Sequence, residues 1–113
     1  MELTRNEVRI MRIFWTAKEP LSRAALMELN PDMNWDMAAL HNGLNSLLTK
    51  GAIREDGFYK NGKRMGRLFA AEYTLEEYLV SLIEPVKDII DYRLLFEKLV
   101  EKADSLIADN EFR

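Results

Sequence analysis

Cysteine is absent from this 113-residue chain, and histidine occurs once. Without cysteine there is no disulfide, thiolate metal site or cysteine nucleophile, and the lone His41 offers no cluster for a metal. No apolar run reaches the ~20 residues that a membrane span needs, and the charged start MELTRNEVR has no signal-peptide core after it. We therefore expect a cytoplasmic protein with no cofactor, no metal and no membrane contact.

A catalytic constellation is also lacking. The chain has no Ser-His-Asp or His-Cys set, no HExxH and no phosphate-binding glycine loop of recognised form. The spacing of Gly57, Gly62 and Gly66 is typical of turns, and the Glu76-Glu77 pair is typical of a solvated helix start. We predict that the protein is not an enzyme.

Charge is divided unevenly along the chain, although its composition is that of one folded domain or a small domain with an appendage. The formal net charge is -3. Residues 1–71 contain 11 Lys and Arg against 8 Asp and Glu, whereas residues 72–113 contain 5 against 11. Four cations lie within KNGKRMGR, residues 60–67. The two parts therefore favour different partners.

Helix signals dominate the first fifty residues. Thr4 and Glu7 form a capping-box pattern, and helical apolar spacing continues until Lys18-Glu19-Pro20. Ser22 can cap a second, short helix that Asn30-Pro31 must stop. Asn34 or Asp36 can cap a third helix that runs to Gly51.

The third expected helix has two different faces. At 100° per residue, one face carries Met37, Leu40, Leu44, Leu47 and Leu48, and the opposite face carries Ala38, Asn42, Asn45, Ser46 and Thr49. The first predicts core, and the second predicts an exposed polar surface. Gly43 costs ~1 kcal/mol of helix stability, which is acceptable if a neighbouring helix approaches closely there.

After Gly51 the pattern changes to short apolar runs around the turn signals Asp56-Gly57 and Asn61-Gly62. This predicts a β-hairpin with residues 60–67 as its tip. From Thr74, where Glu77 completes another capping box, the helical pattern returns, and Pro85 should kink or divide it. The apolar surface of this helical segment exceeds what one small domain needs to form its core, which suggests a partner helix.

The order of helix, short helix, turn, helix and hairpin is that of a winged helix-turn-helix. The segments LTRNEVRIMRIFW, PLSRAALMEL, WDMAALHNGLNSLLTKGAI and GRLFAAEYTLEEYL resemble the BlaI/MecI penicillinase-repressor family of bacterial transcription regulators. The similarity covers roughly residues 3–80 and includes Trp35 before the third helix. It implies a mainly α fold with a small β-hairpin, a DNA-binding domain over residues 1–73 and a helical dimerisation region over residues 74–113.

The resemblance implies a homodimeric repressor on a palindromic double-stranded DNA operator. The third helix would lie in the major groove, where asparagine can bond adenine, and the wing would lie on the backbone. Arg23 opens the second helix, where a phosphate is favoured, whereas Ser22 serves better as a cap. At the edge of the polar face of the third helix, two interpretations of His41 remain open, a packed or partly exposed structural histidine and a DNA contact. The predicted DNA-contacting residues are Arg23, His41, Asn42, Asn45, Ser46, Thr49, Lys50, Arg54, Lys60, Lys63, Arg64 and Arg67.

The C-terminal helices are expected to join two subunits. The residues assigned to this interface are Leu79, Leu82, Ile83, Val86, Ile89, Ile90, Leu95, Leu99 and Leu106. We expect the self-association to be that of a homodimer.

Departures from the family pattern shape the remaining expectations. Family members commonly carry Lys or Arg on the exposed side of the third helix, but this chain has only Lys50, at its end, so the wing must supply the cations. The cysteine-rich tail of the copper-responsive relatives is absent, and so is the Asn-Phe bond cleaved in the β-lactam-responsive ones. Whether a sensor protease acts on the chain stays open. The alternative is a winged-helix module for protein interaction with weak or no specific DNA binding.

Overall fold

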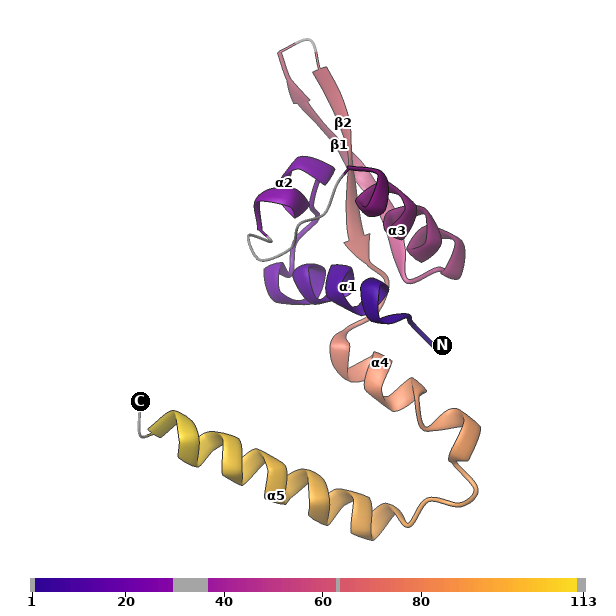
Figure 1. Cartoon of the computed structure of the whole chain (residues 1–113), viewed down its shortest axis with the longest axis vertical. Coiled ribbons are helices and arrows are strands. Elements are labelled where there is room, and N and C mark those ends of the chain that lie inside the picture. Colours follow the sequence, from indigo (N-terminus) through magenta and orange to yellow (C-terminus); the bar gives the residue numbers. More distant parts are fainter. Residues whose placement is uncertain (1, 30–36, 63, 112–113) are drawn as a thin grey trace. The chain divides into compact units, whose positions relative to one another are not determined.

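The computed structural model describes residues 2–29, 37–62 and 64–111. They form a mainly helical chain with one small antiparallel hairpin, as Figure 1 shows. The elements are α1 (Arg5–Ala17), α2 (Arg23–Glu28), α3 (Met37–Lys50), β1 (Ile53–Asn61), β2 (Arg64–Ala71), α4 (Leu75–Ser81), the 3-10 helix η1 (Glu84–Val86) and α5 (Tyr92–Glu111). This order is compatible with a winged-helix arrangement.

The chain divides into two compact units, residues 1–82 and residues 83–113. The first unit extends beyond the expected boundary at residue 73, because α4 packs against α1. Tyr78 of α4 is buried, and its ring centroid lies 5.5 Å from that of Trp15. The Trp15 Nε1 also donates a hydrogen bond to the carbonyl oxygen of Tyr73 at 3.0 Å. The functional division at residues 73 and 74 stays a prediction.

The predicted capping box begins α1. Thr4 Oγ1 accepts from the Glu7 backbone N–H at 3.2 Å, and Glu7 Oε1 accepts from the Thr4 backbone N–H at 2.8 Å. Lys18 ends the helix in the left-handed conformation, with φ of 57°. The buried face of α1 carries Ile10, Met11 and Phe14.

Between α1 and α2 the chain is tied to the hairpin. Leu21 and Phe69 exchange two backbone hydrogen bonds, each 2.8 Å long. Ser22 then caps α2, as predicted, by accepting from the Ala25 backbone N–H at 3.1 Å. The helix stop at Asn30-Pro31, the caps at Asn34 or Asp36, and Trp35 lie outside the described residues.

The apolar face of α3 forms much of the core. Leu40, Leu44 and Leu47 are fully buried, as predicted, but Met37 is exposed because it is the first residue of the helix. A Cβ atom at Gly43 would overlap Cδ1 of Ile10. The missing side chain therefore lets α1 approach α3 closely, which confirms the reason expected for this glycine.

The hairpin is longer than predicted. The strands pair from Ile53 opposite Ala71 to Asn61 opposite Arg64, so most of residues 60–67 lie in strands rather than in a loop. The expected tip at residues 60–67 is therefore too wide. Asn61-Gly62 does mark the turn, whereas Asp56-Gly57 forms a bulge where the register shifts.

The second capping box is also present, since Thr74 and Glu77 exchange side-chain and backbone hydrogen bonds at the start of α4. Pro85 lies in η1, between α4 and α5, so it divides the helical segment as predicted. Within the described ranges, none of the helices combines the length and the apolar character needed to cross a membrane.

Candidate nucleic-acid interface

The outward face of α3 is polar and uncharged. His41, Asn42, Asn45 and Thr49 are exposed on it. Asn45 Nδ2 lies 3.1 Å from His41 Nε2, and Thr49 Oγ1 donates to the Asn45 carbonyl oxygen at 2.9 Å. His41 is thus exposed and linked to Asn45 rather than packed in the core. This face presents amide, imidazole and hydroxyl groups, which can bond base edges.

Ser46 and Lys50 are turned toward α1 instead. Ser46 Oγ donates to Glu7 Oε2 at 2.7 Å, and Lys50 Nζ donates to Glu7 Oε1 at 2.6 Å. Lys50 Nζ also donates to the Glu2 carbonyl oxygen at 3.2 Å. These polar groups are therefore engaged inside the protein. Their roles in DNA contact stay predictions, and each contact would require these bonds to be shared or broken.

Glu7 is the buried acid at the centre of this cluster, with only 3% of its surface exposed. Burial acts to raise its pKa, but the hydrogen bonds from Lys50, the Thr4 backbone and Ser46 outweigh burial. The pKa of the Glu7 carboxyl falls from its ordinary 4.5 to about 2. Sequence reasoning assigned Glu7 to a helix cap and missed its second role, because the contact joins residues 43 positions apart.

The cations of the hairpin differ in their surroundings. Lys60 is exposed. Arg67 Nη1 lies 2.5 Å from Glu55 Oε1. Arg54 Nη1 lies 2.9 Å from Glu72 Oε1 and donates to the Ala71 carbonyl oxygen. Lys63 and the side chain of Arg64 lie outside the described residues. Lys60 is therefore a better source of free positive charge than Arg54 or Arg67.

Arg23 packs against the protein surface rather than extending from α2. Its Cζ lies 6.0 Å from the centroid of the Phe69 ring, and Cζ of Arg67 lies 5.6 Å from the same centroid. Nε and Nη2 of Arg23 are buried and have no hydrogen-bond partner in the part of the chain that the structure describes. The two arginines thus converge on one ring, and because the unpaired donors of Arg23 are buried, its contact with a DNA phosphate stays a prediction.

Two apolar side chains accompany the hairpin cations. Phe58 is 65% exposed and Met65 is 69% exposed. Phe58 pairs across the strands with Arg67, and Lys60 pairs with Met65, so all four belong to one face of the hairpin. Sequence reasoning missed the exposed pair because Phe58 was counted only as a strand residue.

The comparisons with known proteins do not assign this chain to a family. A scan against family models found no match, and searches of curated proteins and of solved structures found no significant similarity. The resemblance to the BlaI/MecI family therefore stays a prediction from the quoted residues.

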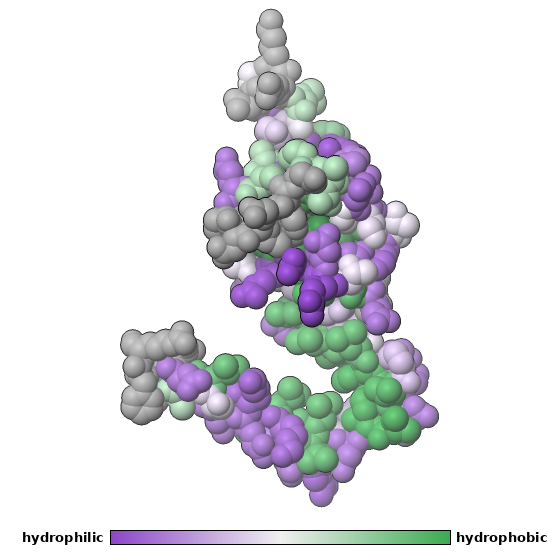
Figure 2. Space-filling model, viewed as in Figure 1, coloured by the Kyte–Doolittle hydropathy of each residue, from purple (hydrophilic) through white to green (hydrophobic). Residues whose placement is uncertain are grey.

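The residues assigned to a dimer interface are only partly covered. Leu79, Leu82, Val86, Ile89, Leu99 and Leu106 are exposed, whereas Ile83, Ile90 and Leu95 are half-buried. Figure 2 shows apolar residues over α4 and over the segment around η1. In α5, Phe96 and Val100 are exposed as well and were missed. Helical spacing places Phe96 on the same side of α5 as Leu99 and Leu106, whereas Val100 lies about 100° around the helix from Leu99.

Proposed function

We propose that this protein is a transcriptional repressor that binds a palindromic double-stranded DNA operator as a homodimer through a winged helix-turn-helix. The observation that carries the proposal is the exposed polar face of α3, which includes Asn42 and Asn45. In this proposal α3 enters the major groove, where an asparagine can make two hydrogen bonds to adenine. No catalytic step is part of the proposed function.

The division of labour follows from the charges. The outward face of α3 carries no cation, and Lys50 is held by Glu7. Affinity for phosphate must then come from the hairpin, which includes Lys60, Lys63 and Arg64 in its sequence. We propose that the wing supplies sequence-independent affinity and that the asparagines select the sequence.

Self-association is supported by the exposed apolar residues of α4 and α5. A two-fold symmetric dimer would present two copies of α3 to two half-sites, which matches a palindromic operator. It would also gather the positive hairpins, so a net charge of -3 does not exclude DNA binding.

The test is binding to the promoter region of the protein's own gene, compared with bulk DNA over a salt series by fluorescence anisotropy. We expect tighter binding to the promoter at every salt concentration and a linear fall of log affinity with log salt. Equal affinity for both DNAs would contradict the proposed repressor.

The second candidate is a module for protein interaction with weak or no specific DNA binding. It is favoured by the exposed Phe58 and Met65 on the hairpin and by the uncharged outward face of α3. Under this alternative the promoter has no advantage over bulk DNA, whatever the salt concentration.

A further inference from the structure

The side chains of His41 and Asn45 are joined on the outward face of α3, where the two residues lie four positions apart. Asn45 Nδ2 lies 3.1 Å from His41 Nε2. Because an amide nitrogen can only donate, Nε2 must accept this bond, and the proton of the neutral ring must lie on Nδ1. Residues four apart on a helix are neighbours, so the contact depends on no other element. His41 therefore takes up one of the two N–H groups of the Asn45 amide.

The rest of the Asn45 amide is free to bind a ligand. Its Oδ1 atom accepts no hydrogen bond from the part of the chain that the structure describes, and Thr49 bonds the backbone carbonyl of Asn45 rather than its side chain. One N–H donor and one oxygen acceptor are left. In the major groove adenine offers an acceptor, N7, and a donor, N6, whereas guanine offers two acceptors, N7 and O6. The amide held by His41 thus matches adenine and lacks the second donor that guanine needs.

Asn42 provides a comparison on the same face. It is exposed like Asn45, but among the described ranges its side chain has no hydrogen-bond partner. Its amide can therefore turn to present either its oxygen or its N–H groups. Only Asn45 has its hydrogen-bonding pattern set before DNA is bound, which lowers the entropy cost of binding.

We propose that His41 is a positioning residue that makes Asn45 select adenine over guanine. The proposal rests on the proposed binding of DNA through α3, and it adds the residue that sets the orientation of one amide. His41 acts through Asn45 and needs no contact with a base. The bond is exposed in the free protein. In a complex it would be removed from water, where hydrogen bonds are electrostatically stronger.

The test is the selection of bound duplexes from a library of random DNA sequences, followed by sequencing. Asn45→Ala identifies the base pair at which the preference of the wild type for adenine is lost. His41→Leu has no acceptor and should lower the adenine-to-guanine ratio at that base pair about two- to tenfold, the effect of one ordinary hydrogen bond. His41→Gln keeps an acceptor that can bond an asparagine four residues later, so it should retain most of the preference.

Two controls separate this role from a general loss of binding. Asn42→Ala identifies the base pair read by Asn42, and the preference there should not change in either His41 variant. The double variant His41→Leu with Asn45→Ala should lose no more selectivity than Asn45→Ala alone, because His41 acts through the amide. Circular dichroism checks that each variant is folded.

An unchanged adenine-to-guanine ratio in the folded His41→Leu variant would overturn the proposal. A loss in His41→Gln as large as that in His41→Leu would also overturn it, as would an Asn45→Ala variant that selects the same sequences as the wild type. If His41→Leu instead loses selectivity at a different base pair, His41 contacts a base directly and is not a positioning residue. A wild type that enriches no sequence at all would contradict the proposed repressor itself, so the two failures are distinguishable.

Discussion

The Nζ atom of Lys50 lies 2.6 Å from Oε1 of Glu7, so the last residue of α3 is joined to the first turn of α1. Glu7 thereby serves two structures at once, because the same carboxylate accepts the Thr4 backbone N–H that begins α1. One buried acid holds the relative position of the two helices that pack at Gly43.

Replacing this acid should weaken the fold. Glu7→Gln removes the charge that Lys50 and Ser46 bond, and we expect the free energy of unfolding to fall by about 2 kcal/mol at pH 7, since hydrogen bonds to charged groups contribute more than neutral ones. Urea titration followed by circular dichroism measures the change. Glu2→Gln, at an exposed residue whose side chain is not in the cluster, is the control.

The same acid predicts a pH dependence. Because the folded-state pKa of Glu7 lies below its ordinary 4.5, at about 2, its stabilisation is complete above pH 4.5 and is lost as the pH falls toward 2. Unfolding free energies of the wild type should therefore fall more steeply over this interval than those of Glu7→Gln. Parallel curves for the two proteins would mean that the pKa of Glu7 is not lowered by folding.

Close packing of α1 and α3 predicts a coupling between Gly43 and Ile10. Gly43→Ala should destabilise the wild type, because the added methyl group meets Cδ1 of the fully buried Ile10. Ile10→Val removes that atom. In this background Gly43→Ala should become stabilising by up to about 1 kcal/mol, the helix-propensity difference between the two residues. A double-mutant cycle in urea measures the change of sign, and additive effects would refute the close approach.

Sequence selection should depend on the α3 asparagines. Asn42→Ala and Asn45→Ala should each reduce the preference for promoter over bulk DNA by about 1–3 kcal/mol, with little change in binding to bulk DNA. Thr16→Ala, at an exposed polar residue of α1, should leave the preference unchanged. A preference retained in both asparagine variants would assign the reading of sequence to other residues.

Lys60 should contribute affinity without selectivity. Lys60→Ala is expected to weaken binding to promoter and bulk DNA alike and to lower the salt slope by about 1, the contribution of one phosphate contact. Lys98→Ala, in α5 of the second unit, is the matched control and should leave the slope unchanged. If Lys60→Ala also leaves it unchanged, the hairpin does not contact phosphate there.

Variants at two leucines of α5 can show whether a loss of dimer comes from the interface itself or from any added charge. Leu99 and Leu94 are both exposed, but they lie about 140° apart around the helix. Leu99→Asp should convert the dimer to a monomer in sedimentation, because it places a charge among the predicted interface residues of α5. Leu94→Asp should not have this effect. A wild-type mass equal to that of the monomer at all concentrations would contradict the predicted homodimer.

Local features were predictable from the sequence, and contacts between distant segments were not. The Thr4–Glu7 and Thr74–Glu77 boxes span three residues each, and helical periodicity placed Leu40, Leu44 and Leu47 in the core. The bonds from Ser46 and Lys50 to Glu7 depend on how α1 packs against α3. The periodicity of apolar residues within one helix gives no information about that packing.

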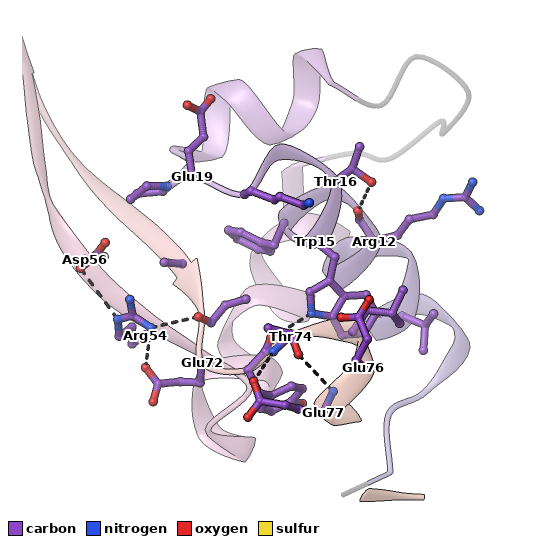
Figure 3. Close-up of a pocket in the computed structure, with 18 residues that line it drawn as sticks. Arg12, Trp15, Thr16, Glu19, Arg54, Asp56, Glu72, Thr74, Glu76 and Glu77 are labelled. Carbon is purple, nitrogen blue, oxygen red and sulfur yellow. Dashed lines mark hydrogen bonds and ion pairs between the residues drawn. The ribbon is translucent and has the colours of Figure 1, made fainter. Parts of the chain in front are cut away.

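The hairpin shows the same limit. Asp56-Gly57 and Asn61-Gly62 have similar turn chemistry, yet only the second closes the hairpin, because strand pairing continues past the first. The sequence also gives no sign of the hollow that is lined by α1, the Glu19-Pro20 connection, the base of the hairpin and the start of α4 (Figure 3). Its lining joins four separate segments, and no local pattern marks them as neighbours.

The bulge at Asp56-Gly57 sets two residues of β1 against one of β2, so Glu55 and Phe58 share a face although three positions separate them. Side-chain alternation is therefore shifted by one residue in β1 at the bulge, whereas β2 keeps its alternation from Phe69 through Arg67 to Met65. For protein engineering, the hairpin beyond residue 57 should be a segment whose length can be changed by adding or removing one cross-strand pair at a time. Such changes should leave Ile53 and Phe69 in the core.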